Sequence, residues 1–396
     1  MSEGRRLLPL VLATAATQAS IVVLAPLLVE IGREFHASLG EVGLARSVLA
    51  GTAVAVSLVI GPAIDRWGVG PVIAAGGGLG MLGAGLAAAA PSLGWFYLAG
   101  LVTGAGVACT LSAGFAGVAS YFSGDRVEWA MGWVVGSQAA AWIVGTPIIG
   151  FLAEEGSWRL SFVVPATIGA LALVAGLMAP PGRATSGTGV REGLTSVFRE
   201  PSARRWTLAE LVAYSAWTAE ITYAGAFYIE SYGLGEATVG LLLPIGSVVF
   251  LVTSTNTSRL TALYSRRPLI ALAALGMGVI LVPLLNWTPA VGITVALVCT
   301  TAFFAAVRSA GSSSLGLVQL PGNPGSMMGA RTASAQLGYV LGAAGGGLVI
   351  ELLGFGALGF VLFAGMAVSA LLILRVDDPV DAGGAPPGRY PEPVPD

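Results

Sequence analysis

Charged residues are scarce in this sequence. Only 10% of its 396 residues are charged, whereas a soluble globular domain carries about 25%. Nineteen basic and 21 acidic side chains are too few to cover the surface of a soluble protein of this length. The composition therefore excludes a soluble enzyme and a disordered chain, and a net charge of −2 leaves no basic face for a nucleic acid.

Cysteine, histidine and lysine are also rare or missing. Cys109 and Cys299 both lie in apolar runs, and His36 is the single histidine. These residues cannot build a disulfide framework, a metal cluster or a nucleophilic site, so we expect no metal, no cofactor and no enzymatic activity. All 19 basic residues are arginines, which is typical of a GC-rich bacterial gene.

Long apolar runs dominate what remains. The chain is 55% hydrophobic and has 57 glycines, and small residues let transmembrane helices approach closely. A membrane-spanning helix needs about 20 mostly apolar residues. This criterion predicts an all-α membrane protein with twelve transmembrane helices, at 7–31, 38–62, 71–90, 93–121, 130–152, 160–179, 206–231, 237–258, 268–286, 290–315, 327–351 and 355–375.

One long polar segment divides these helices into six and six. We expect an N-terminal half at 1–179, a cytoplasmic linker at 180–204 and a C-terminal half at 205–376. The proline-rich residues 377–396 are expected to form a disordered cytoplasmic tail.

Arginine placement predicts the orientation in the membrane. If the N-terminus is inside, the outer loops hold only Arg33 and Arg159. The inner side then collects Arg5, Arg6, Arg66, Arg126, Arg183, Arg191, Arg199, Arg204, Arg205, Arg259, Arg266, Arg267, Arg375 and Arg389. We therefore expect a multi-pass protein of the bacterial inner membrane with both termini in the cytoplasm.

The two halves are related by an internal repeat. A constant shift of 197 residues aligns Pro71 with Pro268, Gly132 with Gly329 and Ser137 with Ser334. Two parallel six-helix repeats around a central site are what alternating access requires, because one half can then rock against the other.

The loop after the second span carries a recognisable motif. Gly61-Pro-Ala-Ile-Asp65-Arg66-Trp-Gly68 resembles the loop signature of the major facilitator superfamily, and Gly145-Thr-Pro147-Ile-Ile-Gly150 is similar to the fifth-helix motif of its antiporter branch. The resemblance implies a latch formed by Gly61, Asp65, Arg66 and Gly68, and a hinge formed by Gly145, Pro147 and Gly150. From the residues alone, Asp65 could instead form a simple interfacial charge pair, and the glycines could serve plain helix packing.

Two departures from the family pattern matter. Gly70 and Pro71 stand where the loop signature usually has arginines. In the fourth span, Gly100 and Thr103 replace the arginine and glutamine of the drug–proton antiporters, and that arginine is their proton-coupling element. A standard drug–proton antiport mechanism is therefore in question.

Ionisable residues inside spans are candidates for function, because burying a charge in a membrane is costly. Glu220 lies near the middle of the seventh span, and Glu210 lies nearer its end. We expect Glu220, with Glu210, to carry the coupling proton; a structural hydrogen bond is the alternative. Arg46 and Arg308 either pair with Glu220, bind an anion or reach the membrane interface.

In the superfamily, the first, fourth, seventh and tenth helices line the cavity. The resemblance, together with Arg46, then predicts the substrate-binding residues Gln18, Arg46, Thr110, Ser112, Trp217, Tyr223, Thr301, Phe304 and Arg308. A mixed aromatic and polar lining suits an amphipathic small molecule.

The leading expectation is secondary export of a small organic molecule by a monomer in the lipid bilayer, coupled to proton entry. Uptake or exchange of a small anion through Arg46 and Arg308 is the alternative. A receptor or scaffold without transport is the third, which the buried acids of the seventh span disfavour.

Overall fold

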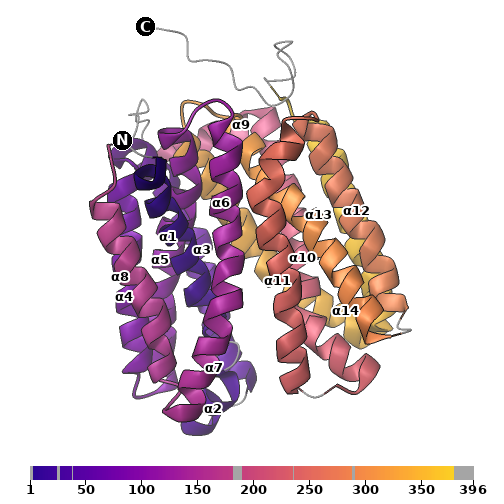
Figure 1. Ribbon diagram of the computed structural model, residues 1–396. Helices are drawn as coiled ribbons and strands as arrows, with labels where there is room; N and C mark the ends of the chain where they lie inside the picture. Colours follow the sequence, from indigo (N-terminus) through magenta and orange to yellow (C-terminus); the bar gives the residue numbers. More distant parts are fainter. Residues whose placement is uncertain are drawn as a thin grey trace, which may run out of the picture. The chain divides into compact units, whose positions relative to one another are not determined.

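The computed structural model describes residues 3–24, 27–37, 39–181, 190–234, 236–287 and 290–378 (Figure 1). Every regular element in these ranges is a helix, as the composition predicts. Nine of the described helices are long and apolar enough to cross a membrane. The all-helical prediction is therefore confirmed, and the chain is a multi-pass membrane protein.

The first half of the chain, up to the linker, contains ten helical segments among the described residues. They are α1 (Glu3–Val22), α2 (Leu28–Glu34), α3 (Leu39–Trp67), α4 (Val69–Ala88), α5 (Leu93–Tyr121), α6 (Arg126–Ala140), the π-helix η2 (Ala141–Gly145), α7 (Thr146–Glu155), the 3-10 helix η3 (Leu160–Phe162) and α8 (Val163–Leu177).

The second half begins with a helix inside the predicted linker. Its elements are α9 (Val190–Arg199), α10 (Pro201–Tyr232), α11 (Glu236–Thr261), α12 (Arg266–Asn286), α13 (Val291–Leu317) and α14 (Pro324–Leu374). Linker residues 182–189 and tail residues 379–396 lie outside the described residues. Asp377 and Asp378, where the tail was predicted to start, are placed and hydrogen-bonded.

Three predicted spans differ from the observed helices. The span at 7–31 is split into α1 and α2. The last two spans form one element, α14, which breaks at Gly354 with φ of 80°. Only glycine adopts this conformation at low cost, so the turn predicted between the spans is a single residue.

The fifth predicted span contains a π-helical turn. Residues Ala141–Gly145 form the π-helix η2, which leads into α7 through Pro147. Proline lacks the N–H that would bond to the carbonyl four residues earlier, and a π-turn is one way in which a helix absorbs that loss. A methyl group added to Gly145 or Gly150 would meet nothing within 4 Å. Close packing is therefore not what requires these glycines here.

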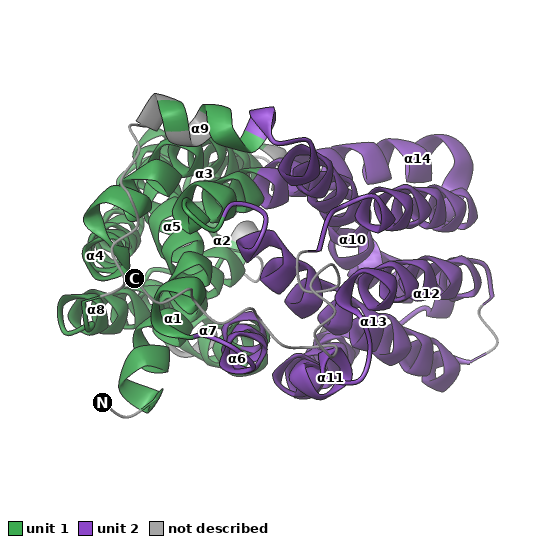
Figure 2. Ribbon diagram, turned by 90° about the horizontal axis from the view of Figure 1, so that it is seen from above, with its two compact units in different colours: residues 1–122, 137–197, 321–333 green, residues 123–136, 198–320, 334–396 purple. Residues whose placement is uncertain are grey.

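The described chain divides into two compact units (Figure 2). Unit 1 comprises residues 1–122, 137–197 and 321–333, and unit 2 comprises residues 123–136, 198–320 and 334–396. Each unit thus includes one short segment from the other half of the sequence. A shift of 197 residues carries 123–136 onto 320–333, so the two exchanged segments are repeat-related.

Contacts inside the units obey the same repeat. In unit 1, a methyl group on Gly329 would lie 2.5 Å from the Ser57 carbonyl oxygen. In unit 2, a methyl group on Gly132 would lie 2.3 Å from the Ser254 carbonyl oxygen. Both residues of the second pair are 197 positions from their counterparts in the first. The repeat seen in the sequence is therefore also a repeat of close helix contacts.

The core of unit 1 depends on glycine in the same way. A methyl group on Gly77 of α4 would lie 2.6 Å from the Gly169 carbonyl oxygen of α8, and one on Gly169 would lie 3.0 Å from that of Gly77. The backbones of these helices touch directly. Without a hydrophobic force between helices in lipid, such close packing supplies much of the attraction.

Candidate functional site

The acids predicted on the seventh span lie on α10, in unit 2. Glu210 is fully buried, and its Oε1 lies 2.7 Å from Nη1 of Arg308 on α13. Arg308 is 1% exposed. The two residues were predicted separately, as a proton carrier and a substrate ligand, and the structure joins them in one buried ion pair.

The ion pair is set among further polar and aromatic groups. The hydroxyl of Ser312 donates to Glu210 Oε1 at 2.9 Å, and the Arg308 guanidinium lies 5.6 Å from the centre of the Tyr214 ring. The indole N–H of Trp206 donates to the Ser312 carbonyl oxygen at 2.9 Å. This network holds α10 against α13 and neutralises the Arg308 charge, because a buried cation needs a counterion.

Glu220 is in a different environment. Its side chain is buried, with 7% of the residue exposed, and it forms no hydrogen bond or ion pair with any residue that the structure describes. A buried ionised carboxylate with no partner is costly, and protonation removes the cost. Arg308 pairs with Glu210 and not with Glu220, although the sequence allowed the second pairing.

The aromatic residues of α10 point in several directions. Trp217 stacks on Phe250 of α11 with ring centres 5.5 Å apart, and it also contacts the Tyr214 ring at 5.9 Å. The hydroxyl of Tyr223 donates to the Ala343 carbonyl oxygen of α14 at 2.6 Å. Trp217 and Tyr223 therefore contact different helices.

The predicted substrate-binding residues on α13 also have different surroundings. Thr301 is buried, and its hydroxyl has no hydrogen-bond partner among the described residues. The Phe304 ring would be 2.7 Å from a methyl group on Gly276, so it packs against α12. Arg308 is the one α13 candidate with an ion partner on α10.

In unit 1, the predicted polar residues are linked by side-chain hydrogen bonds. The Gln18 amide donates to Gln138 at 2.9 Å and accepts from the Trp142 indole at 3.3 Å. Thr110 shares a hydrogen bond of 2.8 Å with Thr17, a residue that the sequence analysis did not select. Thr17 and Gln138 are uncharged polar residues inside helices, and nothing in their sequence spacing indicated a role in the site.

Other candidates of unit 1 have local partners. Arg46 donates to the Ile21 carbonyl oxygen at 3.1 Å. Ser112 donates to Thr332 at 3.0 Å. Arg331 is 1% exposed and lies 3.8 Å from the centre of the Phe115 ring. It is a further buried cation of unit 1.

Asp65 binds the N-terminus of α14, and both belong to unit 1. Its carboxylate accepts from the backbone N–H of Gly325 at 2.6 Å and from that of Ser326 at 2.8 Å. The first N–H groups of a helix have no partner within it and attract an anion. A methyl group on Gly61 would lie 2.7 Å from the Gly325 carbonyl oxygen, so Gly61 permits this approach.

The other two residues of the predicted latch have different surroundings. Arg66 is exposed and forms no hydrogen bond or ion pair with a described residue. Gly68 has φ of 87°, which allows the sharp turn from α3 into α4. Asp65 therefore binds the first N–H groups of α14, Gly61 leaves room for this contact, and Gly68 forms the turn between α3 and α4.

No group of three or more His, Cys, Asp or Glu side chains in the described ranges is placed to hold a metal ion.

Solved structures of transporters share this fold. The human organic anion transporter MFSD10 superposes with a TM-score of 0.79 at 14% identity, covering 94% of this chain and all 100% of the other. The proton:xylose symporter XylE gives 0.79 at 13% identity, covering 94% and 95%. The E. coli fucose:proton symporter FucP gives 0.75 at 16% identity, covering 94% and 98%. No curated protein sequence matches the chain.

The sequence itself matches a family description over nearly its whole length. The Major Facilitator Superfamily matches at residues 10–319 and again at residues 207–394. The second match lies on the second half of the internal repeat. This all-helical membrane protein therefore belongs to the Major Facilitator Superfamily, a family of transporters rather than enzymes.

Proposed function

We propose that this transporter moves a small organic molecule across the bacterial inner membrane by alternating access, and that entry of protons through Glu220 drives export. The main support is the state of Glu220: a buried carboxylate with no hydrogen bond or ion pair among the described residues. Such a group changes charge when a proton binds, and no protein cation has to be displaced first.

Glu210 has a secondary role in this proposal. Its carboxylate already has Arg308 as counterion at 2.7 Å, so protonating it would leave a buried cation unpaired. We therefore assign Glu210 to holding Arg308, and Glu220 to carrying the proton.

The Glu210–Arg308 pair also favours proton-coupled export over the alternative of anion uptake or exchange. An anion that binds Arg308 has to compete with a buried carboxylate at 2.7 Å. Arg46, the other proposed ligand, donates to a backbone carbonyl oxygen. The neighbour MFSD10 is an organic anion transporter, but at 14% identity the likeness concerns the fold.

The experiment compares Glu220→Gln with Glu230→Gln in everted vesicles. Glu230 is an exposed acid on the same helix and serves as the control. A panel of amphipathic compounds and organic anions is first screened for binding by thermal shift. We expect Glu220→Gln to lose accumulation driven by a pH gradient at least about tenfold and to keep counterflow exchange, because exchange needs no net proton movement.

Two outcomes would contradict the proposal. If Glu220→Gln retains the wild-type response to the pH gradient, the proton travels by another route. If the gradient has no effect on the wild type while an anion exchanges, the anion alternative replaces export.

A further inference from the structure

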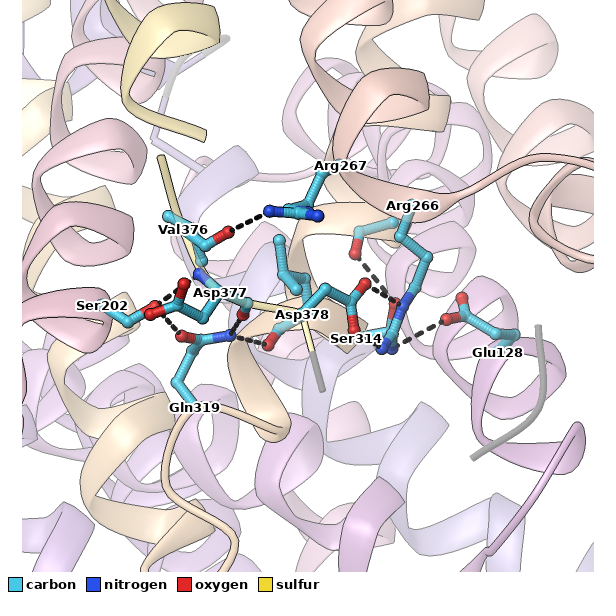
Figure 3. A network of polar contacts seen from close by, with 11 residues as sticks. Glu128, Ser202, Arg266, Arg267, Ser314, Gln319, Val376, Asp377 and Asp378 are labelled. Atoms are coloured by element: carbon cyan, nitrogen blue, oxygen red, sulfur yellow. Dashed lines mark hydrogen bonds and ion pairs between the residues drawn. The ribbon is translucent and has the colours of Figure 1, made fainter. Parts of the chain in front are cut away.

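Arg266, the first residue of α12, lies between two carboxylates of unit 2 (Figure 3). It is 2% exposed. Its Nε and Nη2 donate to the two oxygens of Asp378, at 3.0 and 2.5 Å, and its Nη1 lies 3.6 Å from Glu128 Oε1. Asp378 follows the end of α14, whereas Glu128 lies in the first turn of α6.

The segment that carries Asp378 is held at three consecutive residues (Figure 3). Arg267 donates to the Val376 carbonyl oxygen at 3.2 Å. The Asp377 N–H donates to the Ser202 hydroxyl at 2.8 Å, and the Asp377 carbonyl oxygen accepts from the Gln319 amide at 2.9 Å. Ser202 in turn donates to Gln319 at 2.6 Å. Residues of α10 and α12, together with Gln319 just beyond the end of α13, thus bind this acidic segment through both its backbone and the Asp378 carboxylate.

The internal repeat gives the Glu128 contact a counterpart in unit 1. A shift of 197 residues carries Glu128 onto Gly325, which donates to Asp65 in unit 1. The same shift carries Asp65 onto Ala262, which has no charge. In unit 2 the acid, Glu128, therefore stands in the first turn of the helix, and its positive partner Arg266 lies four residues beyond Ala262, the counterpart of Asp65.

We infer that Ser202, Arg266, Arg267 and Gln319 form a docking site for the acidic segment Val376–Asp378, and that this segment controls how tightly Arg266 holds Glu128. Asp378 makes the bidentate contact, the stronger geometry for an arginine and a carboxylate. Glu128, whose Oε1 lies 3.6 Å from Nη1 of Arg266, is the second and weaker counterion of this arginine. When the segment leaves, Glu128 becomes the main counterion of Arg266, and the first turn of α6 is held more firmly.

The test is hydrogen–deuterium exchange on the full-length protein in nanodiscs, with Asp378→Asn as the main variant. Asp377→Asn is the matched control, because the Asp377 side chain is exposed and only its backbone takes part in the contacts. We expect Asp378→Asn to speed exchange in residues 375–378 about tenfold and to slow exchange in residues 122–131. Asp377→Asn should leave both segments at wild-type rates.

Two further variants separate the charge requirement from a general disturbance. In the Asp378→Asn background, Glu128→Gln should abolish the added protection of residues 122–131. Asp378→Glu, which keeps the charge, should retain exchange rates near those of the wild type.

The outcomes distinguish the two parts of the inference. Wild-type exchange in residues 375–378 of Asp378→Asn would overturn the docking site. A loosened segment with unchanged or faster exchange in residues 122–131 would overturn the control of Glu128. Equal rates in Asp378→Glu and Asp378→Asn would remove the role of the carboxylate.

Discussion

Asp65 and Ser326 are joined by two hydrogen bonds to one carboxylate oxygen. The Ser326 backbone N–H donates to Asp65 Oδ2 at 2.8 Å, and the Ser326 hydroxyl donates to the same oxygen at 2.7 Å. The residues are 261 positions apart in the chain. The end of α3 is therefore fixed to the start of α14 by a charged group placed at a helix N-terminus.

We predict that Asp65→Asn lowers the transport rate and leaves folding largely intact. The asparagine amide presents N–H donors toward N–H groups of α14, so the charge-assisted bonds, about 1.5–3 kcal/mol each, are weakened or lost. The outward-facing state, which we propose that this contact stabilises, should become less populated. Transport in proteoliposomes measures the effect, with the exposed Asp125→Asn as control. A wild-type rate in Asp65→Asn would exclude the latch role.

The Glu210–Arg308 pair predicts strong coupling between two substitutions. Glu210→Gln or Arg308→Gln alone leaves a buried charge without its counterion, and each should cost about 3–5 kcal/mol of stability. The double variant should be less destabilised than the sum of the two, because no charge remains. A double-mutant cycle measured by thermal unfolding of the purified protein tests this. Strictly additive losses of stability would show that the pair is not coupled.

Arg308→Gln also addresses the choice of substrate. If the substrate is an anion held by Arg308, its binding should be abolished, because a buried anion without a countercharge loses its hydration uncompensated. If the substrate is neutral or cationic, its dissociation constant should be retained.

The repeat-related glycines should respond alike to alanine. A methyl group on Gly329 or Gly132 would lie 2.5 or 2.3 Å from a backbone oxygen, which forces the helices apart and should cost about 1–3 kcal/mol. Gly145→Ala is the control, because its methyl group would meet nothing within 4 Å. A lower melting temperature for both of the first two variants, but not for Gly145→Ala, is expected. Equal melting temperatures for all three would contradict the close packing.

Glu34 should make stability depend on acid pH. It accepts a hydrogen bond from the Trp158 indole and another from Arg159, and these contacts hold the pKa of Glu34 below its ordinary value of 4.5. Because the folded state has the lower pKa, the stabilisation is complete above the unfolded-state pKa and is lost as pH falls through the folded-state pKa. This stabilisation is small, because the Glu34 side chain is 44% exposed.

The measurement is the difference in melting temperature between the wild type and Glu34→Gln. This difference should be constant from about pH 7 to pH 5 and shrink toward about pH 3. Glu30→Gln, on the same short helix, is the control, because Glu30 forms no hydrogen bond or ion pair with a described residue. A difference that grows as the pH falls would reverse the assigned sign.

The site was only partly predictable from the sequence. Asp65 could be selected because it belongs to a loop motif, but its contact with the N-terminus of α14 could not be predicted, because 261 positions separate it from Ser326. Arg308 and Glu210 could each be selected as costly buried charges, but their pairing could not be read, because 98 residues separate them. Thr17 and Gln138 carried no signal, since an uncharged polar residue in a helix is equally common as a packing residue.

The sequence by itself determined the class of protein, its all-helical character and the repeat, because hydrophobic length and a constant shift are properties of the chain. Only the tertiary structure decided which buried groups meet. It paired Glu210 with Arg308, left Glu220 without a described partner and set Arg266 between Glu128 and Asp378. The physical reason is that such contacts depend on helix rotation and on close backbone approach, which side-chain packing fixes.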